Sequence, residues 1–468
     1  MNTIAFDFGM IGLGTMGRNL LLNIADHGFA TIGYDRDEAK GKLLESEATK
    51  GTQVKAAPSL AEMIQQLKSP RKIMMLVPAG PIVDAVINDL LPIIAPGDII
   101  IDGGNSHHTD TLKRINSLAD KKIHFMGMGV SGGEAGARYG PSMMPGGDKD
   151  AWKAVQPILE AVAAKVSDQP CVAYMGKAAA GHYVKMVHNG IEYAIMQLIS
   201  EAYDIMKRGL GLSNDELHTV FKKWNEGELQ SYLIEITAAI FLKADDLSKN
   251  KLVDMILDKA GSKGTGKWTS QDAMDLPVSV PTIDIAVALR DLSGYKDERL
   301  KAAALYNPLI KPLKNKDKTI QQLHDGLLAS IIICYAQGLA MLAKASNTLQ
   351  MDIPLKDVVK IWRGGCIIRS SLLEMFTAAF KKEKQLENIL LSKKIALMTK
   401  RKIPALRKMI QQVAVSKIPA TGLMSALGYF DAYCSGQMPV NLIQAQRDLF
   451  GAHTYQRIDR EGIFHTEW

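Results

Sequence analysis

The chain has 468 residues, 47% hydrophobic and 22% charged, a composition typical of a globular protein with two or three domains. Its 56 lysines and arginines against 49 acidic residues give a formal charge of +7, which favours anionic small molecules no less than nucleic acid. Aromatic residues make up only 6%, and the most basic stretch, 381–408, lacks the interleaved stacking residues of single-strand binders. We therefore expect no nucleic-acid partner.

Cysteine usage and hydropathy narrow the class further. The four cysteines lie far apart and form no CxxC pair, which argues against a disulfide framework or a zinc site. No His/Asp/Glu cluster with metal-ligand spacing appears either, so we expect no metal. The N-terminus has no basic segment before an apolar stretch, and we find no apolar run of about 18 residues that would span a membrane. The sequence predicts a soluble, reduced, cytoplasmic protein without a membrane contact.

The first element is a strand, a glycine turn and a helix. Residues 4–11 are rich in β-branched and aromatic types, and a helix-like segment follows the glycine turn, which reads Gly12, Leu13, Gly14, Thr15, Met16, Gly17. In a dinucleotide fingerprint the first glycine permits the tight turn, the second lets amides approach the pyrophosphate, and the third allows close helix packing. The next strand, 30–34, ends at Asp35, where a carboxylate can accept hydrogen bonds from a ribose 2′-hydroxyl. We predict a Rossmann nucleotide site; the alternative is a glycine-punctuated βα unit without a ligand.

Two further strand signals continue the alternation of strands and helices. Strand-like residues 72–77 and 98–102 end in polar or turn residues, and helical segments 59–67, 81–91 and 109–120 separate them. Open α/β sheets bind ligands at the carboxyl ends of their parallel strands. The pattern predicts a doubly wound, mainly parallel sheet.

Residues 127–147 contain eight glycines in 21 positions. Glycines free the backbone for positive φ and bring amides close to a ligand, so we expect this segment to cup an anion around Ser131, Gly132 and Gly133. The alternative is a flexible linker, although Met, Tyr, Val and Arg are interspersed among these glycines.

The stretch 185–193 places polar residues where a packed helix should be apolar. On a helix its five polar members project from one face: Lys185, His188, Asn189, Glu192 and Tyr193. The apolar residues between them can be buried on other faces, so the polar row is expected to line a cleft. The alternative is an exposed amphipathic face with a Lys/Glu pair at i, i+7.

After residue 177 strand signals almost vanish and helical periodicity continues to about residue 434. Segments 198–235 and 333–374 resemble each other, with Trp224 and Trp362 in matching places, which predicts an internal duplication that serves as scaffolding. Residues 435–468 are neither a regular helical pattern nor a disordered tract, and we expect them to dock on another surface. We predict a dinucleotide-binding domain over 1–178, an all-helical domain over 179–434 and a tail over 435–468.

Several motifs together resemble the 6-phosphogluconate dehydrogenase (decarboxylating) family, in its long, dimeric type. They are KMVHNGIEY, IDGGNS, VSGGEAGARYGPSMMPGG, GSKGTGKW, WRGGCIIRS and NLIQAQRDLFGAHTY, and the likeness covers essentially the whole chain. The resemblance implies a pentose-phosphate enzyme that oxidises 6-phospho-D-gluconate at C3 and releases CO2 to give ribulose 5-phosphate. It also implies a homodimer.

Residue roles follow from the same resemblance. Lys185 is implied as general base, Glu192 as general acid, and Asn189 as their catalytic neighbour. Substrate contacts are implied for Asn105, Ser131, Gly132, Gly133, His188, Asn189, Tyr193, Lys263 and Arg290, and, from the tail of the partner subunit, for Arg447 and His453. Cofactor contacts are expected for Gly12, Leu13, Gly14, Thr15, Met16, Gly17, Asp35, Arg36, Asp37, Val77, Pro78, Ala79 and Asn105.

These residue types suit the implied chemistry. Lys185 can take the C3 hydroxyl proton if burial or nearby positive charge keeps its amine neutral, and Glu192 can protonate the enediol if its pKa is raised. Lys263, Arg290 and Arg447 are cations suited to a phosphate. No metal is needed for this decarboxylation.

The chain departs from the NADP-dependent members of that family around the second strand. Those members carry Asn-Arg-Thr where this chain has Asp35, Arg36 and Asp37, and a lysine where it has Pro78. We expect both carboxylates to repel a 2′-phosphate, and Gly14 replaces an alanine common there, so NAD is the expected cofactor. Because Arg36 is retained, NADP use stays open.

Two other readings remain from the sequence. One is a β-hydroxyacid dehydrogenase acting on an unphosphorylated acid, which would share the fingerprint, the SGG loop and the helix lysine. The other is a non-catalytic nucleotide-binding protein on the same scaffold. A requirement for the substrate phosphate, and CO2 release that depends on Lys185, would exclude them.

Overall fold

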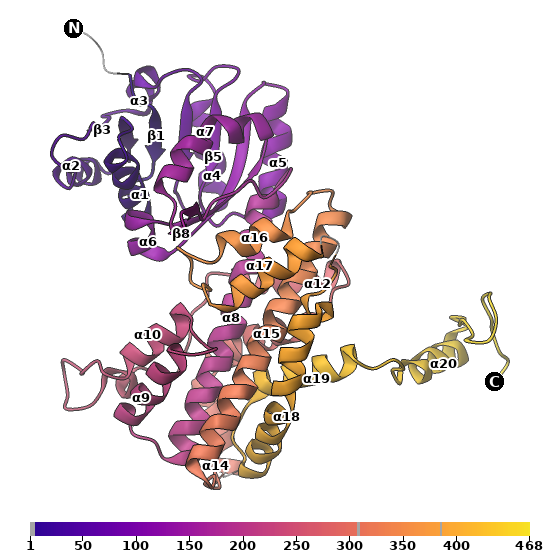
Figure 1. Ribbon diagram of the computed structural model, residues 1–468. Coiled ribbons are helices and arrows are strands. Elements are labelled where there is room, and N and C mark those ends of the chain that lie inside the picture. The colour runs from indigo at the N-terminus through magenta and orange to yellow at the C-terminus, as the bar shows by residue number, and fades with distance from the viewer. Residues whose placement is uncertain (1–4, 307–308, 384–385) are drawn as a thin grey trace.

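The computed structural model describes residues 5–306, 309–383 and 386–468. A sheet with covering helices forms the N-terminal part, a bundle of helices forms the middle part, and the last residues project away from both (Figure 1). The predicted first strand included residue 4, and the basic stretch 381–408 included 384–385; these positions lie outside the described residues.

One seven-stranded sheet forms the centre of the N-terminal part, with the order β3-β2-β1-β4-β5-β6-β7. All neighbours pair in parallel except β6 and β7, which are antiparallel. The strands are β1 (Phe8–Ile11), β2 (Thr31–Tyr34), β3 (Val54–Ala56), β4 (Lys72–Met75), β5 (Ile99–Asp102), β6 (His124–Ser131) and β7 (Ser142–Gly147). The order confirms the predicted doubly wound sheet, and nearly unbroken apolar runs such as IIID in β5 suit strands covered on both faces.

Helices cover both faces of this sheet (Figure 1). They are α1 (Thr15–Asp26), α2 (Glu38–Ser46), α3 (Leu60–Gln66), α4 (Pro81–Leu90), α5 (His108–Ala119), α6 (Gly133–Tyr139) and α7 (Lys149–Val162), and a short hairpin of β8 (Lys165–Val166) and β9 (Gln169–Pro170) follows. Buried apolar side chains form a separate cluster on each face of the sheet.

The glycine-rich segment 127–147 is mostly regular structure, so the alternative of a flexible linker is wrong, and Ser131, Gly132 and Gly133 form the turn between β6 and α6. It comprises most of β6, all of α6 and β7. Its glycines let α8 (Ala180–Asp204) lie directly on the strands. A Cβ on Gly129 would stand 2.3 Å from the Cβ of Lys185, and a Cβ on Gly146 would stand 2.2 Å from the Gly181 amide nitrogen. These glycines therefore serve close packing of helix on sheet.

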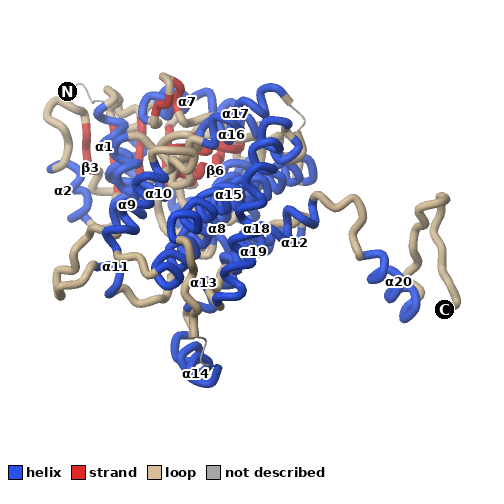
Figure 2. Tube along the Cα trace, turned by 60° about the horizontal axis from the view of Figure 1, so that its bottom comes forward, coloured by secondary structure: helices blue, strands red, loops and turns tan. Residues whose placement is uncertain are grey.

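The helical part is built around two long, buried helices. They are α8 (Ala180–Asp204), continued by the π-helical turn η1 (Ile205–Gly209), and α15 (Lys316–Thr348). Their apolar side chains share one core with the surrounding helices, which are α9 (Asn214–Asn225), α10 (Tyr232–Ile240), α11 (Leu252–Met255), α12 (Thr265–Asp275), α13 (Pro281–Ser293), α14 (Lys296–Tyr306), α16 (Leu355–Ile361), α17 (Leu372–Lys382), η2 (Ile389–Leu391), α18 (Lys393–Ser416) and α19 (Thr421–Tyr433). Figure 2 shows α8, α15 and α18 running side by side.

Helix α15 alone among the described helices is long and apolar enough to cross a membrane, with a mean hydropathy of 1.9 over 18 residues. The sequence analysis found no such run, because Ser330, Gln337 and Gly338 interrupt it. Of that window 89% is buried inside the protein, as expected for the central helix of a large helical core.

The helical part contains the predicted duplication. A long helix, a short helix ending near a buried tryptophan, and a further helix occur first as α8, α9 and α10, and again as α15, α16 and α17. The two copies meet at equivalent places: Ser231 and Ser370 form a β-bridge, and the Tyr232 amide donates to the Arg369 carbonyl at 3.1 Å. The two copies thus pack against each other around a local pseudo-symmetry.

The tail contains a regular helix, α20 (Val440–Gly451), which the sequence pattern did not predict. Asp448 is fully buried within the tail and accepts hydrogen bonds from the amides of Thr454 and Thr466 and from the Trp468 indole. The tail therefore folds on itself, although it projects away from the body in Figures 1 and 2.

Candidate active site

The polar face of α8 is buried where the helix crosses β6. Lys185 is 7% exposed, His188 is fully buried, and Asn189 and Tyr193 are 9% and 7% exposed. Glu192 lies at the edge of the same face, with 22% of its side chain exposed. The alternative of an exposed amphipathic helix surface is therefore wrong.

Lys185 has an enclosed amine. Its aliphatic stem lies against Gly129, where any side chain would collide with it. Burial lowers the pKa of Lys185, and the charge of Glu192 opposes that shift. No hydrogen bond from the Lys185 amine to another described residue contributes to the shift.

Glu192 shows the opposite shift. Burial raises the pKa of this carboxyl, while the positive charges of Lys185 and Arg290 oppose the effect. The same helix thus carries a lysine and a glutamate whose pKa values are drawn towards each other. Such a pair is suited to exchange protons with a bound ligand.

His188 links three elements through one chain of hydrogen bonds. Its Nδ1 lies 3.1 Å from Asn189 Oδ1, and Asn189 Nδ2 donates to Thr265 Oγ1 at 3.0 Å, so Nδ1 carries the proton. Its Nε2 then accepts from the Ser131 hydroxyl at 3.4 Å. Burial holds the pKa of His188 well below its usual range, which keeps the ring neutral. The edge-to-face contact with Trp362, at 5.6 Å between ring centroids, fixes its plane.

Arg290 and the backbone of Lys263 lie against Tyr193 on this face. The Arg290 guanidinium lies 3.6 Å above the Tyr193 ring, and the Lys263 amide donates to Tyr193 Oη at 3.4 Å. Gly266 allows the close approach of α12 to the same ring. The structure therefore brings Lys263, Arg290 and Tyr193 together beside Glu192, as predicted for a site that receives an anionic group.

The turn Ser131-Gly132-Gly133 lies against the second half of the duplication. Gly132 has φ +117°, and a Cβ there would stand 2.6 Å from the Gly365 carbonyl oxygen. The WRGGC segment thus holds this turn in place, which is consistent with a scaffolding role of the repeat. Together with Trp362 it shapes the candidate site.

Asn105 is exposed beyond β5, and a buried network below it fixes its loop. Asp102 is fully buried and accepts hydrogen bonds from the Gly104 amide at 3.0 Å and the Ser106 hydroxyl at 2.6 Å. His182 of α8 lies 3.0 Å from the Asp102 carbonyl oxygen through Nε2. The sequence analysis missed Asp102 and His182, although the motif IDGGNS contains the first.

A cavity of about 790 Å³ lies at the carboxyl ends of β1, β2 and β4. Six of the residues predicted for the cofactor are among those that line it, Gly12, Gly14, Asp35, Arg36, Val77 and Pro78. Its position and size match the crevice in which a doubly wound sheet binds a dinucleotide.

The glycine turn has the predicted geometry at two of its three glycines. Gly12 has φ +91°, and a Cβ there would stand 2.6 Å from the Leu76 carbonyl oxygen. A Cβ on Gly17 would stand 1.9 Å from the Gly12 carbonyl oxygen, so only glycine fits. Gly14 caps α1 at an ordinary φ with open space around it, so the protein itself leaves room for alanine there.

Asp35 is tied to this turn by the protein itself. Its Oδ2 accepts from the Leu13 amide at 2.8 Å, and Lys40 Nζ lies 3.3 Å from its Oδ1. Burial raises the pKa of Asp35, but hydrogen bonds from the Asp37 and Leu13 amides and from Lys40 outweigh burial and lower it. Asp35 is therefore a carboxylate acceptor at the cavity wall.

Both Asp35 and Asp37 were expected to face a 2′-phosphate, but Asp37 caps α2 and is not among the residues that line the cavity. Its Oδ1 accepts from the Ala39 amide at 3.0 Å and caps α2. The sequence could have signalled the cap, because Asp precedes a helix-forming segment there. Lys40, on the first turns of α2, lines the cavity and was missed.

The remaining predicted cofactor residues have other surroundings. Thr15 and Met16 lie on the first turn of α1, with Thr15 exposed and Met16 packed against the core of the sheet. Ala79 is exposed after β4. Thr15, Met16 and Ala79 are not among the residues that line the cavity.

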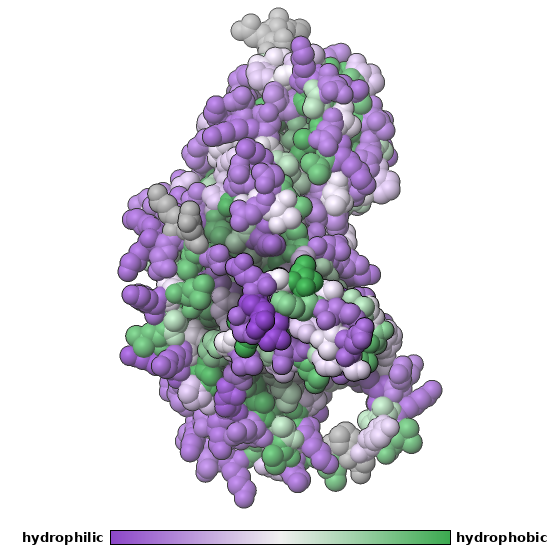
Figure 3. All heavy atoms as spheres, turned by 90° about the vertical axis from the view of Figure 1, so that its right-hand side faces the viewer, coloured by the Kyte–Doolittle hydropathy of each residue, from purple (hydrophilic) through white to green (hydrophobic). Residues whose placement is uncertain are grey.

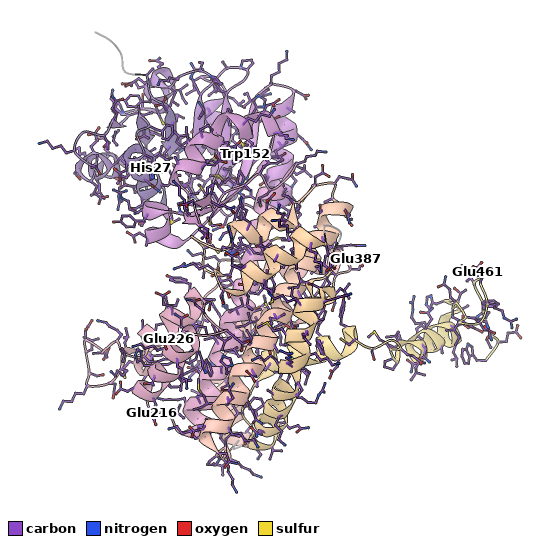
Figure 4. All side chains as sticks on the ribbon, in the orientation of Figure 1. His27, Trp152, Glu216, Glu226, Glu387 and Glu461 are labelled. Atoms are coloured by element: carbon purple, nitrogen blue, oxygen red, sulfur yellow. The ribbon has the colours of Figure 1, made fainter. Side chains whose placement is uncertain are left out.

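Arg447 and His453 are exposed on the projecting tail. Arg447 contacts Gln444 at 3.3 Å, and the His453 ring lies edge-to-face with Phe450. The described part of the chain shows no contact between these two residues and the α8 face. Figure 4 shows Glu461 of the same tail far from the rest of the molecule.

Comparisons with known proteins agree with this geometry over the whole chain. The family model described as the NAD binding domain of 6-phosphogluconate dehydrogenase matches residues 7–186, and the model of that enzyme's C-terminal domain matches 181–468. The chain belongs to the 6-phosphogluconate dehydrogenase family. It is therefore an oxidoreductase that binds a nicotinamide dinucleotide.

Relatives in this family match the chain from end to end. The chain is 51% identical over 462 residues to the NADP(+)-dependent, decarboxylating 6-phosphogluconate dehydrogenase of Bacillus subtilis, covering 98% of each. It is 47% identical over 453 residues to decarboxylating 6-phosphogluconate dehydrogenase 1 of Saccharomyces cerevisiae, covering 96% of this chain and 92% of the yeast protein. The Plasmodium falciparum enzyme, solved in its apo form and with NADP+ and 6-phosphogluconate, superposes with a TM-score of 0.96 at 45% identity, over 99% of this chain and 100% of that one.

A cluster outside the family motifs also brings possible metal ligands together. Glu228, His324 and Asp325 place one ligand atom each within 4.8 Å of the others. Lys402 already occupies the centre, with Nζ 2.6 Å from Glu228 Oε2 and 2.9 Å from Asp325 Oδ1. The ammonium supplies the positive charge there, so the cluster is an ion-pair network of the helical core.

Proposed function

We propose that this chain oxidises 6-phospho-D-gluconate at C3 and decarboxylates it to D-ribulose 5-phosphate and CO2. The observation that carries the proposal is the pair of Lys185 and Glu192, two turns apart on α8, with pKa values shifted towards each other by burial. The reaction needs one group that removes a hydroxyl proton and another that delivers a proton to carbon. The Plasmodium falciparum relative was solved with this substrate, which supports the assignment.

In the first step neutral Lys185 takes the proton of the C3 hydroxyl. A nicotinamide dinucleotide held by the lining of the cavity, such as Gly12, Gly14 and Asp35, would supply the hydride acceptor, and C3 would become a ketone. The new ammonium of Lys185 then donates a hydrogen bond to the ketone oxygen. The bond between the carboxylate carbon and C2 then breaks and CO2 departs. The electron pair of that bond forms the C2–C3 double bond, and Lys185 returns its proton to the C3 oxygen, which gives the enediol.

In the second step the enediol becomes the product ketone. Glu192 delivers a proton to the former C2, which becomes C1 of ribulose 5-phosphate. The hydroxyl on the former C3 returns its proton to Lys185 and becomes the product ketone. Neutral His188 and Asn189 hold their mutual hydrogen bond and offer fixed donors and acceptors to the substrate hydroxyls. No step requires a metal.

We propose the remaining substrate contacts on the same basis. Asn105, Ser131, Gly132 and Gly133 border the reacting end, and Tyr193, Lys263 and Arg290 border the phosphate end. The guanidinium and ammonium groups suit a dianionic phosphate. The predicted domain boundaries at 178 and 434 and the cytoplasmic location stay predictions.

We propose that the site is completed by the tail of a second copy in a homodimer. The tail folds on Asp448, yet it exposes large apolar side chains, such as Leu442, Leu449 and Phe450, which are 62%, 62% and 70% exposed. Figure 3, which views the molecule from the side of the tail, shows hydrophobic side chains on the helical part as well. Apolar surfaces of this kind fit an interface between copies. Arg447 and His453 would then reach the partner's α8 face.

Mixed dimers test the exchange of tails. Lys185→Ala and Arg447→Ala subunits are each expected to be nearly inactive alone. After denaturation and reassembly together, each mixed dimer has one site that combines an intact Lys185 with an intact tail, so activity returns. If each tail served its own chain, every site in the mixture would carry one defect and no activity would return.

NAD is the proposed preferred cofactor. Asp35 lines the cavity as a carboxylate, and Pro78 provides no cation there, which favours a free 2′-hydroxyl over a 2′-phosphate. The Bacillus subtilis relative is NADP(+)-dependent, so this preference would distinguish the chain from that relative.

The direct test follows CO2 and reduced cofactor with 6-phosphogluconate and with gluconate, using NAD and NADP in parallel. Turnover of 6-phosphogluconate with one CO2 per reduced cofactor, and at least about a hundredfold lower kcat/KM for gluconate, is expected from the cation cluster. Equal use of gluconate would refute the substrate assignment. A higher kcat/KM with NADP would refute only the cofactor preference.

A further inference from the structure

The adenosine end of the cofactor cavity holds two cations, and each stands beside a carboxylate. Lys40 Nζ lies 3.3 Å from Asp35 Oδ1, and Arg36 Nη2 lies 3.4 Å from Asp89 Oδ2. All four side chains line the cavity. The charge around a bound 2′-phosphate therefore depends on two ion pairs, Lys40 with Asp35 and Arg36 with Asp89. Only the first pair lies wholly near the glycine turn in the sequence.

Asp89 reaches the cavity from α4, on the wall opposite the turn after β2. Buried apolar residues of α4, such as Val83 and Leu90, hold the helix on the sheet. This packing turns the last turn of the helix towards the cavity, where Asn88 and Asp89 lie among the lining residues. Arg36 and Asp89 are 53 positions apart, so their pairing arises from the fold.

We propose that Asp89 is a specificity-determining residue of the cofactor site, which selects against a 2′-phosphate by engaging Arg36 and by adding a second negative charge to the cavity wall. This inference rests on the proposed function in one respect, that the cavity receives the adenosine half of a nicotinamide dinucleotide. It does not depend on the substrate or on which cofactor the parent protein prefers.

The physical basis is the difference in charge between the two cofactors. A phosphate monoester carries about −1.5 to −2 charges at neutral pH, whereas a 2′-hydroxyl carries none. An arginine fork is the strongest side-chain partner for a phosphate, but Arg36 must leave Asp89 to act as one. Asp89 itself repels the phosphate and leaves a hydroxyl unaffected. Because the Arg36 and Asp89 side chains are 75% and 55% exposed, water and salt screen both effects, and the selectivity is modest.

Asp37 provides the matched control. It is an exposed aspartate next to Arg36 in sequence, but its carboxylate caps α2 instead of lining the cavity. Asparagine is as good an N-cap as aspartate, so Asp37→Asn removes the same unit charge from the same surface and keeps the helix. Asp89→Asn removes the charge that faces the cavity.

The experiment compares 2′,5′-ADP with 5′-AMP by isothermal titration calorimetry on the full-length protein. We expect Asp89→Asn to tighten 2′,5′-ADP binding about three- to tenfold at low salt and to change 5′-AMP binding less than about twofold. The gain should shrink at high salt. Asp37→Asn should change neither ligand by more than about twofold, and Asp89→Asn in an Arg36→Met background should keep only part of the gain.

Each other outcome overturns the inference. Equal gains from Asp37→Asn and Asp89→Asn would reduce the effect to net charge, and no gain from Asp89→Asn would show that its carboxylate does not face the 2′ position. Failure of both ligands to bind any variant would remove the adenosine site from this cavity. Because these titrations need no substrate, they can fail while the proposed reaction stands, and lack of turnover with 6-phosphogluconate leaves their result intact.

Discussion

Charged residues behave differently in two regions of this molecule, the buried face of α8 and the adenosine end of the cofactor cavity. On α8, Lys185 is almost fully enclosed and donates no hydrogen bond to the described residues, so burial lowers its pKa. In the cavity, Arg36 and Asp89 are largely exposed and paired with each other. Burial without a partner prepares a charge for proton transfer, whereas exposure with a partner yields only a graded preference between ligands.

The sharpest test of this contrast is removal of the enclosed amine. Lys185→Ala is expected to reduce kcat by about a thousandfold or more, since it deletes the base for the C3 hydroxyl and the donor to the ketone. Stopped-flow measurement of cofactor reduction at saturating substrate would show the loss. Lys177→Ala, which removes an exposed lysine paired with Asp352, is the control and should keep kcat within about twofold. Comparable losses in both variants would contradict the special role of burial.

The two glutamates of α8, Glu192 and Glu201, provide the next test. Burial raises the pKa of both Glu192 and Glu201, but Glu201 accepts the Gly422 and Leu423 amides at 2.7 and 2.9 Å. Glu192→Gln is expected to lower kcat about a hundredfold with little change in stability, because the acid is lost. Glu201→Gln should leave kcat nearly unchanged and lower the free energy of unfolding by about 1–3 kcal/mol. One of the two backbone amides, Gly422 or Leu423, would then face the side-chain NH2 of glutamine and lose its acceptor. Urea unfolding and initial rates on both variants separate the roles; a reversed pattern would contradict the assignment.

A smaller effect is expected when the paired cation of the cavity is removed. Lys40→Met deletes the ammonium beside Asp35, so Asp35 repels a 2′-phosphate without compensation, and kcat/KM for NADP should fall about three- to tenfold. The value for NAD should change less than about twofold. Parallel initial-rate measurements decide; equal losses for both cofactors would mean that Lys40 only supports the fold of α2.

The smallest effect concerns the pH dependence of kcat/KM. Since burial lowers the pKa of Lys185 and raises that of Glu192, we expect a bell-shaped profile, with the limb set by Lys185 below the usual pKa of a lysine and the limb set by Glu192 above that of a glutamate. The negative charge of Glu192 raises the pKa of Lys185. In Glu192→Gln only the limb set by Lys185 remains, and we expect it to move to lower pH by less than about one unit. A shift to higher pH would contradict the assigned coupling.

The sequence predicted much of the site because local patterns carry it. The spacing of 185–193 placed five polar groups on one face, the glycine turn with Asp35 predicted the nucleotide site, and the change of texture near residue 177 predicted the transition from sheet to helices. Motif resemblance assigned the family, which the comparisons confirm. Helical period, strand hydrophobicity and tight glycine turns are short-range properties, so they can be read along the chain.

Only the tertiary structure decided which distant residues meet. In the folded protein the strands of the glycine-rich segment 127–147 pack directly against α8, and Trp362 contacts His188. Asp37 caps α2, whereas Asp89 lines the cavity. The tertiary structure also made the apolar helix α15 the centre of the core and left Arg447 outside its own chain's site. The pairing of Asp89 with Arg36 depends on how α4 packs against the sheet, and no pattern within either segment encodes that distance.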